Sequence, residues 1–162
     1  MTNKFKPYLS IYIHWPFCEM KCPYCDFNSH VRPEIDQERW KRALLSELAT
    51  ESNLYPNRRI SSLFFGGGTP SLMEPDTITA LLQAVDQYWG LGNDVEITLE
   101  ANPTSVEKTR FENFRSAGVN RLSIGAQSFD DNALKFLGRT HTAREVIAAL
   151  DIARTTFPRY SF

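Results

Sequence analysis

The chain has few cysteines, almost no net charge and no long hydrophobic run. Among its 162 residues are only three cysteines, and 18 basic and 19 acidic side chains give a formal net charge of -1. This balance offers no electrostatic attraction for nucleic acid, although it leaves peripheral membrane association open. No apolar run approaches the ~20 residues of a membrane span, and residues 1–10 lack the apolar core of a signal peptide. We therefore expect a cytoplasmic protein that binds small molecules.

Short apolar runs alternate along the chain with segments of helical periodicity. Runs rich in β-branched and large apolar residues predict strands at 9–15, 60–65, 95–99 and 121–125. Amphipathic spacing and capping boxes predict helices at 38–52, 75–89, 104–118 and 142–156. This order, with about thirty to thirty-five residues per unit, is typical of an α/β fold with a parallel (β/α) repeat and right-handed crossovers.

The last residues of the sequence predict an incomplete barrel. Residues 158–162 fit the start of a fifth strand, whereas a full eight-unit barrel needs about 250 residues. We expect residues 1–162 to be the N-terminal part of a core domain and the front part of a partial TIM-type barrel, without the C-terminal domain. An open sheet is the alternative, but its unprotected edge would favour aggregation.

All three cysteines fall in one eight-residue window, as Cys18, Cys22 and Cys25. Thiolates at this spacing can converge on one metal centre, and three of them leave a four-iron cluster with one iron that no side chain holds. An odd number of thiols also argues against a disulfide framework. Zinc is the main rival, although zinc sites usually have a second, distant pair of ligands. Three nearby side chains could supply a fourth zinc ligand: His14, Asp26 and His30.

The loops that follow the predicted strands are unusually informative, and in parallel α/β folds the ligand lies at these carboxyl ends. The cysteines follow the first strand, Gly66-Gly-Gly-Thr-Pro-Ser71 the second, Glu100-Ala-Asn-Pro103 the third and Gly125-Ala-Gln-Ser128 the fourth. Successive glycines let a backbone approach a ligand closely, but this spacing matches no phosphate or dinucleotide motif, so a simple turn is the alternative. We predict a ligand site at this rim.

Four side chains near the rim have both a functional and a structural interpretation. Glu100 and Gln127 can face the ligand, or each can cap a helix or pair with a surface base. Arg139 can clamp a carboxylate or end a helix as a solvated cation. Tyr24 can stack on a base or fill the core.

The cysteine window, with the aromatic Tyr24 before its last cysteine, resembles the signature of the radical S-adenosylmethionine (SAM) superfamily. Four motifs in order resemble the oxygen-independent coproporphyrinogen III oxidase group: Tyr12-Ile-His-Trp-Pro-Phe-Cys18, Phe65-Gly-Gly-Gly-Thr-Pro-Ser-Leu72, Glu100-Ala-Asn-Pro103 and Asn120-Arg-Leu-Ser-Ile-Gly-Ala-Gln-Ser-Phe129. The oxidases of that group have a further cysteine two residues after the third, where this chain has Phe27. With phenylalanine at this position, the chain resembles the heme chaperone branch of the group.

The resemblance implies a radical SAM barrel that binds a [4Fe-4S] cluster and SAM. The implied cluster ligands are Cys18, Cys22 and Cys25. The positions that match the first SAM site are Tyr12, Gly67 and Glu100. The positions that match a second cofactor site in the oxidase are Tyr24, Gly68, Thr69, Gln127 and Arg139.

The implied function is the binding of heme and its transfer to an acceptor protein, with the heme held by a part of the protein beyond Phe162. The implied partners are heme or a porphyrin, an electron donor such as a flavodoxin or ferredoxin, and a heme acceptor. Radical cleavage of SAM is compatible with the resemblance, which identifies no catalytic residue. The alternatives are an oxygen-independent coproporphyrinogen III oxidase, which decarboxylates its substrate in heme biosynthesis, and a zinc-stapled binding module.

Overall fold

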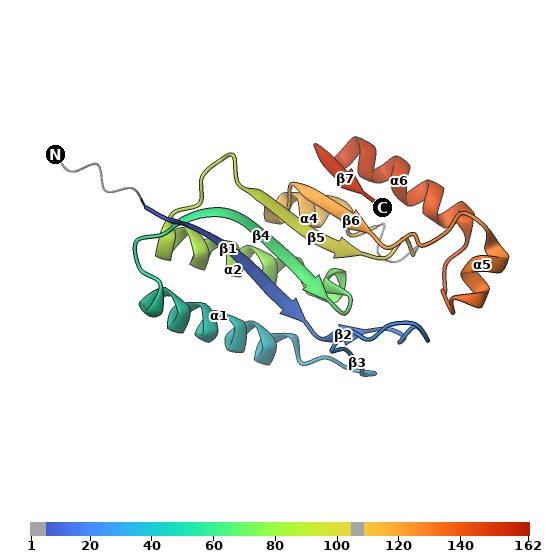
Figure 1. Cartoon of the computed structure of the whole chain (residues 1–162), viewed down its shortest axis with the longest axis horizontal. Coiled ribbons are helices and arrows are strands. Elements are labelled where there is room, and N and C mark those ends of the chain that lie inside the picture. Colours follow the sequence, from blue (N-terminus) through green and yellow to red (C-terminus); the bar gives the residue numbers. More distant parts are fainter. Residues whose placement is uncertain (1–5, 105–108) are drawn as a thin grey trace.

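A parallel sheet organises the protein, whose computed structural model describes residues 6–104 and 109–162 (Figure 1). Its strands lie in the order β1-β4-β5-β6-β7, and every neighbouring pair is parallel. The strand bounds are Tyr8–Trp15 for β1, Arg59–Gly67 for β4, Glu96–Ala101 for β5, Arg121–Ile124 for β6 and Arg159–Ser161 for β7. The parallel repeat predicted from the sequence is therefore confirmed, including the fifth strand.

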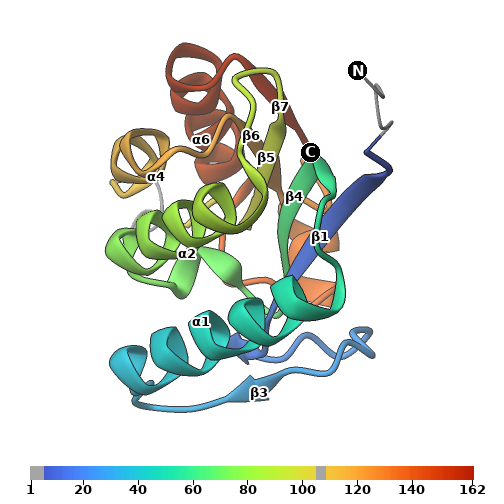
Figure 2. The same ribbon diagram turned by 90° about the vertical axis from the view of Figure 1, so that its left-hand side faces the viewer.

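Helices cover one face of this sheet, as Figure 2 shows from the side. They are α1 (Gln37–Leu54), α2 (Pro75–Trp89), α4 (Phe111–Ala117) and α6 (Ala143–Thr156). The capping box predicted at the start of α6 is present, because the Thr142 side chain and the Glu145 side chain each bond the other's backbone N–H. The second predicted box, Thr104 to Glu107, extends beyond the described residues.

Four small elements were not predicted from the sequence. A two-stranded parallel pair, β2 (Phe17–Cys18) and β3 (His30–Val31), flanks the cysteines, and a 3-10 turn, η1 (Pro70–Leu72), follows the glycine run. The short helix α5 (Asp131–Phe136) precedes α6. Each is too short to produce a periodic hydrophobic pattern, so only its contacts with the rest of the fold define it.

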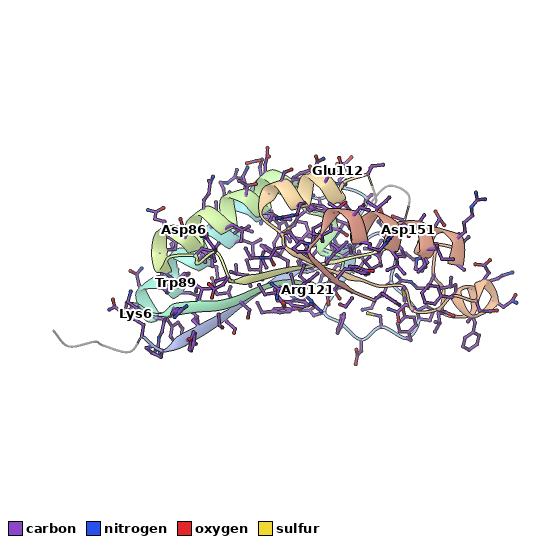
Figure 3. All side chains as sticks on the ribbon, turned by 90° about the horizontal axis from the view of Figure 1, so that it is seen from above. Lys6, Asp86, Trp89, Glu112, Arg121 and Asp151 are labelled. Atoms are coloured by element: carbon purple, nitrogen blue, oxygen red, sulfur yellow. The ribbon has the colours of Figure 1, made fainter. Side chains whose placement is uncertain are left out.

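The two faces of the sheet differ in polarity, because side chains alternate along each strand. One face packs against the helices through a buried apolar core that includes Trp15, Phe65, Leu99 and Leu122. The opposite face carries a polar network in which Arg121 donates to Ser161 (2.8 Å) and Arg159 pairs with Glu96 (3.1 Å). Figure 3 shows Arg121 on the side of the sheet away from the helices.

The helices can also be compared with the requirements of a membrane span. Within residues 6–104 and 109–162, none of them combines the length and the apolarity needed to cross a bilayer.

Replacing Ile78 by alanine is expected to lower the free energy of unfolding by about 2–5 kcal/mol, because the change leaves a cavity in the core. Ile78 on α2 is 0% exposed, whereas Ile147 on α6 is 54% exposed. The matched variant Ile147→Ala is expected to change stability by less than about 1 kcal/mol. Urea denaturation followed by circular dichroism measures both variants, and equal losses would contradict the assigned core.

Candidate functional site

A pocket of about 400 Å³ lies at the carboxyl ends of the strands. In Figure 1 the arrowheads of β1, β4 and β5 point toward this end of the molecule, where β2 and β3 also lie. The pocket is lined by all three cysteines and by seven of the side chains or glycines predicted to bind cofactor: Tyr24, Gly67, Gly68, Thr69, Glu100, Gln127 and Arg139. The fold thus brings together residues from four separate loops, as the strand order requires.

Tyr12 is the predicted site residue that does not line this pocket. Its ring stacks on Phe64, with centroids 5.8 Å apart, on the polar face of the sheet. The side chain is 58% exposed. The Tyr12 pKa is raised, mainly by partial burial and to a smaller extent by the charge of Glu100. The phenol therefore interacts electrostatically with a residue of the pocket although it does not line the pocket.

The cysteine loop, residues 16–29, is fixed at both of its ends. At its start, Gly68 N donates to Trp15 O and Thr69 N donates to Phe17 O, each at 2.7 Å. At its end, the His14 ring bonds Asn28 O through Nε2 at 2.9 Å. These contacts tie the loop to the glycine run and to β1, so the cysteines occupy a defined position over the strand ends.

Two of the glycines are required by contacts within the protein itself. Gly67 has φ +116°, and a Cβ there would lie 2.9 Å from Trp15 O. A Cβ on Gly68 would lie 2.5 Å from Phe17 O and 3.0 Å from Cys18 Sγ. The glycine run therefore allows the β4 loop to pack directly against the cysteine loop, which is a structural reason for glycine at these positions.

The three thiols share the pocket without forming a finished metal site. Within the described ranges, no group of three or more His, Cys, Asp or Glu side chains is arranged to hold a metal ion. Each cysteine is free and partly exposed, and a turn closed by Cys25 N and Cys22 O (3.0 Å) brings two of them together. To bind a metal, the three cysteine side chains would therefore have to move closer together, while the loop that carries them stays held at both ends.

The surroundings of the thiols fit a thiolate-bound cluster. Ser29 lines the pocket and is only 6% exposed, yet its hydroxyl has no hydrogen-bond partner among the residues described. Arg139 Nη1 already donates to Cys22 Sγ at 3.3 Å. Three thiols beside buried donors match a cluster ligated by cysteine, whose properties depend on hydrogen bonds to sulfur.

Glu100 places a desolvated carboxyl group in the pocket wall. Its Oε2 accepts a hydrogen bond from Gly67 N at 3.1 Å. Burial raises the Glu100 pKa above the ordinary value, and the Gly67 bond opposes this effect. The carboxylate can therefore gain stability from a cationic or N–H donor that enters the pocket.

Asn102 is a site residue that was not singled out from the sequence. Its Oδ1 accepts from Arg139 Nη2 at 2.6 Å, and its Nδ2 donates to Thr69 Oγ1 at 3.3 Å. It thereby links the loops that follow β4 and β5 to Arg139. Its place in the Glu100-Ala-Asn-Pro103 motif, directly after a strand, was the available signal.

His141 is the second unexpected residue. Gln127 has φ +67° and lies at the centre of a tight turn in which Ser128 N donates to Ala126 O at 2.9 Å. The buried His141 ring donates through Nε2 to the same carbonyl at 3.0 Å, and burial lowers its pKa, which favours the neutral ring. His141 thus supports the strained backbone that holds Gln127 at the pocket.

The comparisons with known proteins agree with this geometry. The family model described as the radical SAM superfamily matches residues 12–162, and the chain belongs to that superfamily. It is 45% identical over 148 residues to heme chaperone HemW of Escherichia coli (strain K12), covering 91% of this chain and 39% of the relative. It is 50% identical over 149 residues to radical S-adenosyl methionine domain-containing protein 1, mitochondrial, of Bos taurus. This match covers 92% of this chain and 34% of the relative.

A solved structure gives the same fold. Coproporphyrinogen III oxidase (HemN) from Escherichia coli matches with a TM-score of 0.84 and 28% identity, over 96% of this chain and 36% of that one. The predicted radical SAM barrel fold is therefore confirmed for the part that the chain contains. The chain spans about two fifths or less of the length of these relatives.

Replacing Glu100 by glutamine is expected to flatten the pH dependence of stability. Because burial raises the Glu100 pKa, the folded state keeps its proton to higher pH than the unfolded state, so the wild-type stability falls as pH rises above 4.5. Glutamine cannot ionise but can still accept from Gly67 N. Urea denaturation at a series of pH values should therefore show the variant gaining stability relative to the wild type as pH rises, and a stability difference that stays constant or changes in the wild type's favour would contradict this.

Proposed function

We propose that the chain holds a [4Fe-4S] cluster through Cys18, Cys22 and Cys25, and SAM beside it. The observation that carries this proposal is the common pocket, in which the three thiols face loops from β4, β5 and β6. Membership of the radical SAM superfamily implies both groups. When bound, the cluster supplies an electron to the sulfonium group of SAM.

Different residues of the pocket would contact different parts of SAM. Glu100 presents a desolvated acceptor for a cationic amino group. Gly68 brings the backbone close to Cys18, and Tyr24 offers a partly exposed ring for stacking on a base. Gln127 also lines the pocket and can contribute its side-chain amide. Together these groups orient the cofactor.

We further propose that the whole protein is a heme chaperone of the HemW type, which delivers heme to an acceptor protein and takes electrons from a flavodoxin or ferredoxin. The identity to named heme chaperones supports this proposal. So does Phe27, which occupies the position of the further cysteine in the oxidases; it is 56% exposed and lines the pocket. In this proposal the heme-binding site lies in the remainder of the protein. The protein acts in the cytoplasm.

Coproporphyrinogen III oxidation is the second candidate, favoured by the structural match to HemN. The full-length protein is expected to bind hemin in equilibrium titrations and to leave coproporphyrinogen III unconverted under reducing, anaerobic conditions with SAM. Phe27→Cys, assayed in parallel, tests whether residue 27 limits the oxidase reaction. Conversion of the substrate by the unmodified protein would overturn the chaperone assignment.

Replacing Cys22 by alanine is expected to abolish cluster assembly, because it removes one of three ligands. Anaerobic reconstitution with iron and sulfide, followed by absorption and electron paramagnetic resonance spectra, measures the loss. Glu19→Ala, an exposed change in the same loop, is the control and should assemble a normal cluster. A normal cluster in Cys22→Ala would refute the ligand assignment. Stoichiometric zinc in the unmodified protein, without a cluster signal, would instead support the zinc module.

A further inference from the structure

Arg139 connects the cysteine loop to the ends of two strands. It lies in the segment between α5 and α6, which packs against the cysteine loop: a Cβ on the preceding Gly138 would lie 2.8 Å from Pro23 Cδ. Its Nη2 donates to Asn102 Oδ1 at 2.6 Å and to Gly125 O at 2.9 Å. The guanidinium plane is therefore fixed by the groups that follow β5 and β6.

The fixed guanidinium directs its other arm at a cysteine. Nη1 donates to Cys22 Sγ at 3.3 Å. Both hydrogens of Nη2 are used by the Asn102 and Gly125 oxygens, so the direction of Nη1 follows from the planar geometry of the group. Nε is buried and has no partner within the described residues.

This geometry separates two roles for Arg139. A carboxylate clamp needs a fork with two free, parallel donors. Here Nη2 is already committed to protein oxygens, and Nη1 faces sulfur. The contacts therefore favour an interaction with the metal ligand over a clamp for a second cofactor molecule.

We propose that Arg139 is a positioning residue that sets the reduction potential of the cluster through its hydrogen bond to the Cys22 sulfur. The proposal rests on the proposed function, because it requires Cys22 to be a cluster ligand. Reduction adds negative charge to the cluster and its thiolates. A cationic N–H donor at one of these sulfurs stabilises the reduced state more than the oxidised state, and so raises the potential.

The experiment compares midpoint potentials in the full chain, reconstituted anaerobically and titrated without SAM while electron paramagnetic resonance follows the reduced cluster. Arg139→Gln is expected to make reduction roughly tenfold less favourable, equivalent to about 59 mV for a one-electron couple. Arg139→Lys keeps the charge but loses the fork, so an intermediate shift is expected. Arg144→Gln removes an exposed charge from α6 and should leave the potential unchanged.

The other outcomes each decide the question. An unchanged potential in Arg139→Gln, with reduced SAM affinity, would assign Arg139 to a cofactor clamp and overturn the proposal. If Arg139→Gln assembles no cluster, the midpoint potential of Arg139→Lys is compared with that of the wild type instead: a lowered potential supports the proposal and an unchanged one overturns it. If neither variant assembles one while Arg144→Gln does, Arg139 only anchors the loop and the proposal fails. Absence of a cluster in the unmodified chain would instead refute the proposed function.

Discussion

Backbone pairing between β1 and β4 continues past the ends of both strands, and the position of the cysteines depends on it. The bonds from Gly68 N to Trp15 O and from Thr69 N to Phe17 O extend the register of the two strands into the loops. The glycine run makes this extension sterically possible. The sheet therefore determines where the three cysteines lie, although they belong to a loop.

The repetitive part of this architecture could be predicted from the sequence because it depends on periodicity. The predicted strands and the helices predicted at 38–52, 75–89 and 142–156 are present, with shifts of a few residues at the ends. The helix predicted at 104–118 is shorter: among the described residues only Phe111–Ala117 (α4) is helical, and residues 109 and 110 form a turn. Hydrophobic alternation and capping reflect local energetics, which a sequence displays directly. Most predicted site residues also meet in one pocket, because carboxyl ends of parallel strands share an edge.

The remaining features depend on contacts between distant segments. The Arg139 to Cys22 bond joins residues 117 positions apart, and no local pattern signals it. Tyr12 belongs to a recognisable motif, yet its ring stacks on Phe64 and does not line the pocket. The buried His141 acts through the Ala126 carbonyl, a main-chain group that the sequence does not distinguish. These are three-dimensional properties, and the structure was needed to find them.

The polar face of the sheet has a consequence for how the fold can be extended. Glu96 lies between Arg121 and Arg159, at 3.9 and 3.1 Å, and Arg121 also bonds Thr98 and Ser161. Burying a lone charge is strongly unfavourable, whereas burying charges that already have partners costs far less. The two arginines share one carboxylate, so the cluster keeps one net positive charge, and further strands or another polypeptide that closed over this face would need to supply one acidic group.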